Sequence, residues 1–488
     1  MKNLKKLSLL AASALLAVAF LAAGCGSDSA SSGSSSKNTT VTVGATPVPH
    51  GEILNEIKPL LAKGVREQSN VTVLNHVNIT DLKVADGTVH GAWGFSVRER
   101  AAYDIEAKAV LIATGGAAGL YRPNNPGFSR HKMWYPPFNT GAGYAMGIRA
   151  GAEMTTLEHR FVALRCKDTI APTGTIAQGG GAKQVNAKGE IYETKYGLTT
   201  PQRIFGTVEE NRRGMGPCYL DTRHITAEQQ DDLYHAYLNM APAQTLKWIE
   251  NGKGPKGQPV EVEGTEPYVV GGHTASGFWV ATNRETTVHG LFAAGDVAGG
   301  APQKYVTGAL AEGEIAAASM AEYLAAAKGT ASHEEAGEDE LMLQEYEAYL
   351  AREPGNLTAE QLEEAMQKVM DEYAGGIHTD YRYNRSRLTL ADEKIEHLES
   401  LLPQLAADGP YGLLKIYELR ERLTVCRALI AHLLARRETR WHTFGENADY
   451  PEQSPEGLCY INSRFENGAF HIYRRPLIKG GHYEHTHQ

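Results

Sequence analysis

The sequence predicts an α/β protein, and three features of the chain support this fold class. The first is a pair of continuous apolar strands that run into glycines, AVLIATGG at 109–116 and GLFAAGD at 290–296. Such strands are typical of parallel sheets that are buried on both faces. The second is a glycine-rich, mixed region at 165–267, and the third is a charged, helical region at 331–488. We therefore expect a parallel sheet that is interrupted by an α+β insertion and followed by a helical domain.

The composition is that of an ordinary folded protein. A chain of 488 residues has room for about three domains, and its 42% hydrophobic and 22% charged residues are typical of globular chains. The net charge of −9 offers no basic surface to a phosphate backbone, so we expect no nucleic-acid partner. The five cysteines form no CxxC pair, and we therefore expect no metal site or iron–sulfur cluster in this chain.

The first 25 residues have the pattern of a bacterial lipoprotein signal. Lys2, Lys5 and Lys6 precede an uncharged run at 7–23, and small residues lead to Cys25, the expected lipidation site. The alternative is a transmembrane anchor, because the run is at the lower limit of a membrane span. A genuine signal would make this chain a membrane-anchored lipoprotein, attached only through its N-terminus.

Two further segments separate this signal from the rest of the chain. Residues 26–40 are almost entirely small and polar, as in a flexible linker, and residues 41–64 read as one strand followed by one amphipathic helix. Residues 1–64 as a whole resemble the start of the methionine-binding lipoproteins of ABC importers.

The next residues predict a β-meander that begins the main sheet region, at 65–164. Short alternating strands are expected at 71–74, 79–84 and 88–95, with a tight turn at Asp86-Gly87 between the last two.

The ends of the two apolar strands carry the chemistry of the predicted site. Glycines at a strand end let the backbone approach a ligand closely, and an aspartate there can accept hydrogen bonds from ribityl hydroxyls. A helix expected at 309–326 would offer its N-terminal amides to an electron-rich flavin ring. An ordinary strand-to-turn junction is the simpler interpretation of either motif alone. The predicted cofactor-binding residues are Ala113, Thr114, Gly115, Gly116, Gly295, Asp296 and Gly308.

From about residue 64 onward the chain resembles the flavoprotein superfamily of succinate dehydrogenase and fumarate reductase, and within it the adenylylsulfate reductase alpha-subunit family. The resemblance rests on long collinear segments, which lie at 131–168, 199–222, 266–283, 436–453 and 458–476. It implies an FAD-binding domain in two parts, 65–164 and 268–330, a capping domain at 165–267 and a C-terminal helical domain with a tail at 331–488.

The same resemblance implies a reaction and its partners. The reaction is the reversible two-electron reduction of adenylylsulfate to sulfite and AMP in the cytoplasm, with FAD as the electron carrier. Electrons would come from a ferredoxin-like beta subunit that holds iron–sulfur clusters. A fumarate reductase-like flavoprotein is an alternative, although Ala142 stands where the fumarate branch has an acidic residue.

Four site residues follow from the resemblance alone. Trp134 matches a tryptophan that lines the flavin and offers an electron path to the partner. Arg165 and Arg203 match arginines that hold the sulfate or sulfite end of the substrate, a task that suits planar, permanently charged guanidiniums. His273, after two glycines, matches an active-site histidine beside the substrate.

One expected element is not found in the sequence. The only literal GxGxxG match, at 252–257, reads as a polar loop instead of the turn that binds a dinucleotide pyrophosphate. We therefore expect an incomplete FAD-binding domain, a partial FAD site and impaired activity, from either a recombined reading frame or a genuine lipid-anchored enzyme. The alternative from another functional class is a methionine-importer-type surface lipoprotein that carries an inert flavoprotein remnant.

Overall fold

The computed structural model describes most of the chain from residue 70 onward. Cys25, the segments at 26–40 and 41–64, and Trp134 lie outside the described residues. Within the described part, no helix combines the length and the apolar character that a membrane span requires. The described residues are 4–8, 70–123, 133, 135–169, 173–252, 254–302, 304–326, 338–440 and 445–477.

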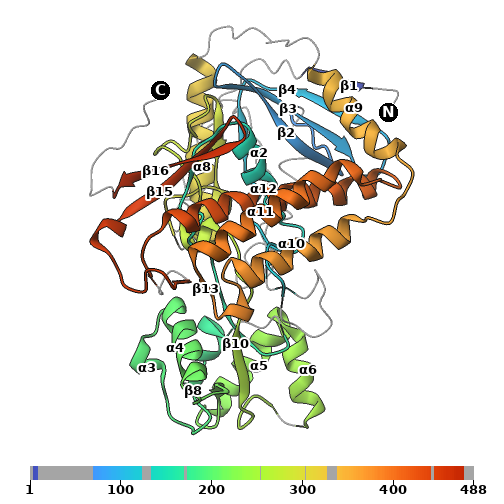
Figure 1. Cartoon of the computed structure of the whole chain (residues 1–488). Coiled ribbons are helices and arrows are strands. Elements are labelled where there is room, and N and C mark those ends of the chain that lie inside the picture. Colours follow the sequence, from blue (N-terminus) through green and yellow to red (C-terminus); the bar gives the residue numbers. More distant parts are fainter. Residues whose placement is uncertain are drawn as a thin grey trace, which may run out of the picture.

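A four-stranded sheet forms the top of the molecule in Figure 1, in the order β1-β4-β3-β2. Its strands are β1 (Leu4–Ser8), β2 (Val77–Ala85), β3 (Thr88–Ser96) and β4 (Ala102–Glu106). The predicted meander is confirmed for β2 and β3, which are joined at Asp86 and Gly87 with φ values of 48° and 72°. The prediction of a strand at 71–74 is wrong, because these residues form no ladder and Val73 is 51% exposed.

The two apolar strands pair with each other. β5 (Val110–Ile112) and β12 (Leu291–Ala293) are parallel, with Val110 opposite Leu291 and Ile112 opposite Ala293. All of β12 is fully buried, whereas Leu111 of β5 is 37% exposed, so only one strand of this pair is covered on both faces by described residues. The pairing brings the ends of both strands to one edge.

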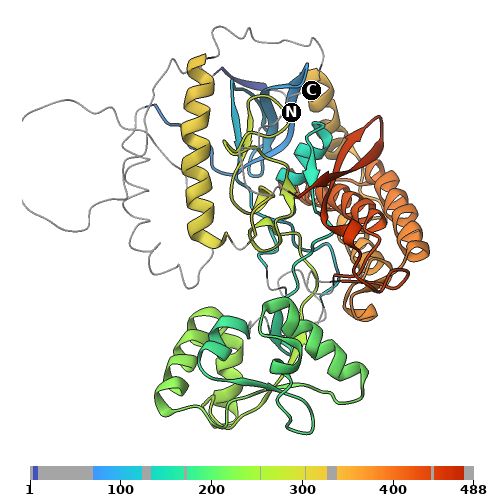
Figure 2. The ribbon, with the colours of Figure 1, turned by 90° about the vertical axis from the view of Figure 1, so that its left-hand side faces the viewer.

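The middle of the chain forms an α+β unit at the bottom of Figures 1 and 2. Its sheet has the order β7-β10-β9-β8, and the sequence at 252–257 lies, as predicted, in the loop between α6 and β10. Its elements are β7 (Leu164–Cys166), η1 (Gly174–Gln178), β8 (Lys183–Val185), α3 (Glu193–Tyr196), α4 (Thr200–Arg212), β9 (Tyr219–Asp221), α5 (Ala227–Met240), α6 (Pro242–Glu250) and β10 (Val260–Gly264).

The C-terminal region contains the predicted helices, but it also returns to the strands. A hairpin of β15 and β16 joins β6 and β11 in a sheet of order β11-β6-β15-β16, so the residues after the predicted helices form strands. The elements are α9 (Glu338–Ala351), α10 (Ala359–Tyr373), η3 (Ile377–Thr379), β13 (Arg382–Tyr383), α11 (Arg385–Leu401), η4 (Leu402–Gln404), α12 (Pro410–Ala435), β14 (Glu446–Asn447), η6 (Pro455–Gly457), β15 (Cys459–Glu466) and β16 (Ala469–Pro476).

The remaining elements lie around the β5–β12 pair and link it to the other layers. Figure 2 shows α8 upright on one side of this region and the C-terminal helices on the other. These elements are α2 (Ala142–Arg149), β6 (Met154–Thr155), α7 (Gly271–Thr274), β11 (Gly277–Phe278), η2 (Gly295–Val297) and α8 (Tyr305–Ala326).

Helix α12 connects the C-terminal helices to the segment that follows β5. The guanidinium of Arg422 is fully buried, and it donates to the carbonyls of Ala118 at 3.0 Å and Pro137 at 2.7 Å. Glu363 on α10 lies 3.8 Å from the same group and balances its charge. One arginine therefore holds three segments that are far apart in the sequence.

Replacement of Arg422 should unfold the chain more readily. In Arg422→Met two buried carbonyls lose their donor and Glu363 loses its counter-ion, so we expect a loss of about 3–5 kcal/mol in the free energy of unfolding. Denaturant titration measures this loss. Arg437→Met, at an exposed position just beyond α12, is the matched control and should change stability by less than about 0.5 kcal/mol. Equal stability of both variants would contradict the role of Arg422.

The buried carboxyl group of Glu421, next to Arg422 in the sequence, should make the stability of the fold depend on pH. Burial raises the pKa of Glu421 from 4.5 to about 7, although a hydrogen bond from Thr140 opposes this shift. The folded chain then keeps a proton that the unfolded chain releases between pH 4.5 and 7, so stability falls as the pH rises through that window. Relative to Glu421→Gln, the wild type should lose roughly 3 kcal/mol of unfolding free energy across it. Glu314→Gln, at an exposed site on α8, should show the wild-type profile, and a wild-type profile in Glu421→Gln would refute the assignment.

Candidate functional site

The structure brings the two predicted glycine motifs together at one edge. The amide of Ala294 donates to the carbonyl of Ile112 at 3.1 Å, so the chain after β12 runs beside the chain after β5. Ala113 and Thr114 are exposed at this edge, and Gly295 begins η2 with a φ of +76°. This left-handed conformation favours glycine, and it turns the chain so that Asp296 follows directly.

Tyr135 bridges the two motifs. Its hydroxyl accepts a hydrogen bond from the amide of Gly116 at 3.2 Å and donates to Oδ2 of Asp296 at 2.9 Å. Burial raises the pKa of Tyr135 well above its usual value, and the charge of Asp296 adds to this effect. Tyr144, on α2, donates to the backbone carbonyl of Asp296 at 2.7 Å.

Sequence reasoning missed both tyrosines. Both lie in the segment at 131–168 that supports the family resemblance. In this segment Trp134 and Arg165 were predicted as site residues, and Ala142 was compared with the fumarate branch. Their role depends on contacts with Asp296, which is far away in the sequence, so the segment itself contains no signal for it.

His273 lies against the same turn. A Cβ atom on Gly272 would come 1.8 Å from Oδ1 of Asp296, so only glycine allows α7 to approach this carboxylate. The imidazole of His273 packs between aromatic rings, with centroids 4.2 Å from Phe161 and 5.1 Å from Tyr305. The structure therefore places the predicted substrate-side histidine beside the predicted cofactor-side carboxylate.

The environment of His273 favours the neutral imidazole. Burial lowers the pKa of His273, and the negative charge of Asp296 opposes this shift only in part. A neutral imidazole near pH 7 can donate one hydrogen bond and accept another.

Arg165 is buried in the α+β unit and is held by charged and backbone partners. Its guanidinium lies 2.9 Å from Oε1 of Glu263 on β10 and donates to the carbonyl of Thr169 at 2.9 Å. Arg165 and Glu263 are directly opposite each other in the β7–β10 ladder. Much of the charge of Arg165 is thus compensated within the unit.

Arg203 differs from Arg165 because its charge is poorly compensated. It lies on α4, which begins with a capping box between Thr199 and Gln202. Burial lowers the pKa of Arg203, and Glu193 opposes the shift. Its Nε is buried and has no hydrogen-bond partner among the described residues. Such a group suits an anionic ligand.

Helix α8 begins earlier than predicted. The sequence predicted a helix at 309–326 that follows Gly308, but the helix starts at Tyr305, and the amide of Gly308 donates to the carbonyl of Lys304 at 2.8 Å. Gly308, a predicted cofactor-binding residue, therefore lies within the first turn of the helix. Lys304, which precedes the helix, is buried.

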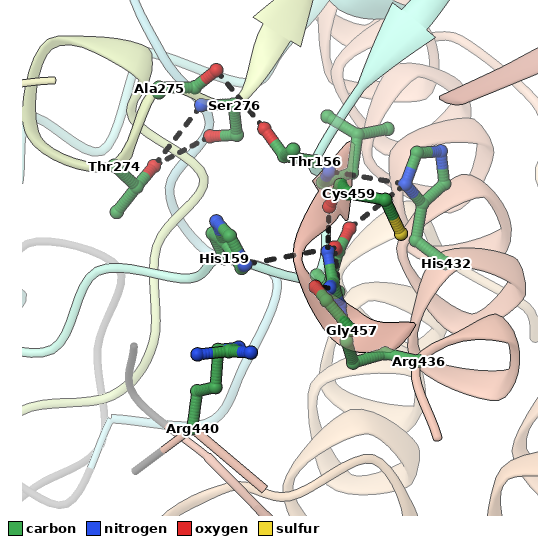
Figure 3. Close-up of polar contacts among 12 residues, drawn as sticks. Thr156, His159, Thr274, Ala275, Ser276, His432, Arg436, Arg440, Gly457 and Cys459 are labelled. Atoms are coloured by element: carbon green, nitrogen blue, oxygen red, sulfur yellow. Dashed lines mark hydrogen bonds and ion pairs between the residues drawn. The ribbon is translucent and has the colours of Figure 1, made fainter. Parts of the chain in front are cut away.

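A second polar cluster lies beside the loop that follows His273 (Figure 3). The hydroxyl of Thr156 donates to the carbonyl of Ala275 at 3.1 Å and joins the two segments. Burial alone would raise the pKa of Glu158, but Arg436, His159 and His432 together hold it well below its usual range. Nη2 of Arg436 lies 2.5 Å from Oε1 of Glu158, and Nδ1 of His432 lies 3.1 Å from Oε2 of Glu158. These contacts position the segment that carries Phe161 against His273.

The described residues fit a flavin better than a metal ion. They contain no group of three or more His, Cys, Asp or Glu side chains that could hold a metal. The partly exposed Asp296 carboxylate instead lies beside Gly272 and accepts a hydrogen bond from Tyr135, and the exposed residues Ala113 and Thr114 follow the neighbouring strand β5. A carboxylate in such a cradle suits the hydroxyls of a ribityl chain.

Comparisons with known proteins agree with this geometry. The family described as "FAD binding domain" matches residues 28–309, which is more than half of the chain. The chain is 28% identical over 459 residues to the adenylylsulfate reductase subunit alpha of Megalodesulfovibrio gigas, covering 80% of this chain and 68% of that protein.

Solved structures give the same result. The adenylylsulfate reductase of Archaeoglobus fulgidus is 34% identical, with a TM-score of 0.77 and coverage of 83% of this chain and 72% of that one. An adenosine-5-phosphosulfate reductase in complex with sulfite as a covalent adduct is 33% identical with the same TM-score and coverage. The chain therefore belongs to the FAD-binding flavoprotein family and, within it, to the alpha subunits of adenylylsulfate reductase.

Proposed function

We propose that this chain catalyses the reversible two-electron reduction of adenylylsulfate to sulfite and AMP, with FAD at the edge formed by β5 and β12. The observation that supports it most is the bridge from Gly116 through Tyr135 to Asp296, with His273 beside it. This bridge joins the two predicted cofactor motifs to the predicted substrate residue in one place. The similarity to reductases that act on this substrate supports the choice of reaction.

Each residue has a distinct task in this proposal. Asp296 would accept hydrogen bonds from the ribityl hydroxyls, and Tyr135 keeps its carboxylate oriented. Arg203 would bind the sulfate end of the substrate, because its Nε lacks a partner among the described residues. His273, as a neutral imidazole, would donate a hydrogen bond to an oxygen of the same group. Arg165 would also attract the sulfate end of the substrate. Its effect would be weaker than that of Arg203, because Glu263 compensates the charge of Arg165.

The electron balance of the reaction is simple. FAD, when bound and reduced by the electron-donating partner, would supply the two electrons that reduce sulfur from the sulfate to the sulfite state. The sulfur–oxygen bond to the nucleotide breaks, and AMP leaves with the bridging oxygen, so no proton is consumed. Arg203 would stabilise the negative charge that develops on the sulfite product. We assign the supply of electrons to a ferredoxin-like beta subunit that holds iron–sulfur clusters, and Trp134 to the path between them.

We further propose that the described residues bind FAD mainly through its flavin and ribityl part. They include the cradle around Asp296, whereas the one GxGxxG match in the sequence lies in the loop between α6 and β10, away from this edge. FAD binding weaker than in full relatives follows from this. We assign the reaction to the cytoplasm, where adenylylsulfate is formed from ATP. Lipidation at Cys25 stays a prediction.

The proposed reaction can be tested with the purified chain and FAD in excess. Sulfite should reduce an artificial one-electron acceptor only when AMP is present, because AMP is the second product of the proposed forward reaction. Fluorescence titration should give dissociation constants for FAD and FMN within about tenfold of each other, since the shared flavin and ribityl part provides most contacts. Fumarate-dependent oxidation of a reduced dye without any AMP-dependent sulfite oxidation would instead support the fumarate reductase alternative.

Arg203→Ala should weaken sulfite binding to the FAD-loaded chain. Loss of a buried, charged hydrogen-bond donor to an anion costs about 2–5 kcal/mol, so the dissociation constant should rise at least tenfold. Sulfite titration followed by flavin absorption measures it. Arg213→Ala is the matched control, because Arg213 follows α4 and its side chain is 54% exposed. Unchanged sulfite affinity in Arg203→Ala would remove Arg203 from the site. Arg165→Ala is less informative, because it also leaves Glu263 without its counter-ion.

A further inference from the structure

A buried ion pair lies directly behind the turn that carries Asp296. Nζ of Lys304 lies 3.1 Å from Oε2 of Glu312, and both side chains are less than one-tenth exposed. Lys304 also donates to the carbonyls of Gly295 at 2.8 Å and Ala298 at 2.5 Å, so all three ammonium donors are used. Neither the family resemblance nor the strand-end motifs assign a role to this pair.

The pair holds both polar groups of the Gly295 backbone. The carbonyl of Gly295 accepts from Lys304, and its amide donates to Oε2 of Glu312 at 2.9 Å. Arg284 binds the other oxygen of Glu312 at 2.9 Å, which holds this carboxylate in one orientation. The left-handed turn at Gly295 is thus held from both sides by opposite charges.

The backbone of Lys304 extends this network to His273. Its amide donates to the carbonyl of Gly272 at 2.8 Å, so the same residue touches the turn before Asp296 and the residue before His273. A shift of Lys304 would therefore move the carboxylate and the imidazole relative to each other. Apolar side chains of similar volume would fill this space at less desolvation cost, and they would leave both backbone groups unbonded.

We infer that Lys304 and Glu312 are positioning residues that set the spacing between Asp296 on the cofactor side and His273 on the substrate side. This inference rests on the proposed function, because it takes Asp296 as a flavin ligand. The pair acts through the backbone of Gly295 and Gly272 and does not contact the substrate. The negative charges of Glu312 and Asp296 both favour the charged form of Lys304, and Asp296 is also the charge that acts on the imidazole of His273.

The test compares Lys304→Met and Glu312→Gln in the full-length chain. NMR titration of His273 without FAD should give a raised pKa in Lys304→Met, because Asp296 then lacks a nearby cation. It should give a lowered pKa in Glu312→Gln, because the ammonium is then uncompensated. Fluorescence titration should show at least tenfold weaker binding of FAD to both variants. In the double variant the loss should be smaller than the sum of the two single losses, as expected for interacting residues.

Controls separate positioning from simple stabilisation. Lys368→Met removes an exposed lysine that pairs with Glu364 at 2.8 Å, and it should match the wild type in every measurement. Lower melting temperatures with wild-type FAD affinity and an unchanged pKa of His273 would overturn the inference. Should Lys304→Met not fold, Glu312→Gln decides alone. Glutamine keeps an acceptor for the Gly295 amide, which supports folding, but it removes the charge that pairs with Lys304. Failure of the wild type to bind FAD would refute the proposed function, whereas the pKa comparison would still test the spacing.

Discussion

The parallel ladder between β5 and β12 determines where the two glycine motifs meet. The two strands come from opposite sides of the inserted α+β unit, and only their ladder brings the two glycine motifs to one edge. Tyr135, Tyr144, Asp296 and His273 owe their proximity to it. The ladder is short, with three residue pairs, so surrounding contacts must keep the pairing in register.

Buried cations provide those contacts. Arg422 joins the segment after β5 to α10 and α12, Lys304 holds the turn after β12, and Arg436 orients Glu158 near Phe161. Each cation bonds both a carboxylate and a backbone carbonyl, so its desolvation cost is offset by geometry that an apolar side chain could not supply. These interactions fix the position of the backbone. The edge at the ends of β5 and β12 consists of backbone and short side chains, so its shape depends on that position.

The C-terminal hairpin shows how the layers support the site. β15 pairs with β6, and β6 pairs with β11, which follows His273 by only a few residues. The buried side chain of Asn462, on β15, accepts a hydrogen bond from Thr155 at 2.8 Å, next to the Thr156–Ala275 contact. The β15–β16 hairpin is therefore part of the support for His273. The C-terminal region is consequently integrated with the flavoprotein fold and is not an independent helical bundle.

The fold class, the two glycine-ended strands and the Asp86-Gly87 turn could be predicted from the sequence, because local periodicity and turn chemistry encode them. The strand-end motif also pointed to Asp296, and the family resemblance pointed to His273. The contacts that these residues make could not be predicted in this way. Tyr135 donates to Asp296, Glu263 pairs with Arg165, and Lys304, which lies before the predicted helix start at Ala309, donates to the carbonyl of Gly295. Such contacts join residues from distant parts of the chain, and no local pattern encodes which buried charge will meet which backbone carbonyl once the layers pack.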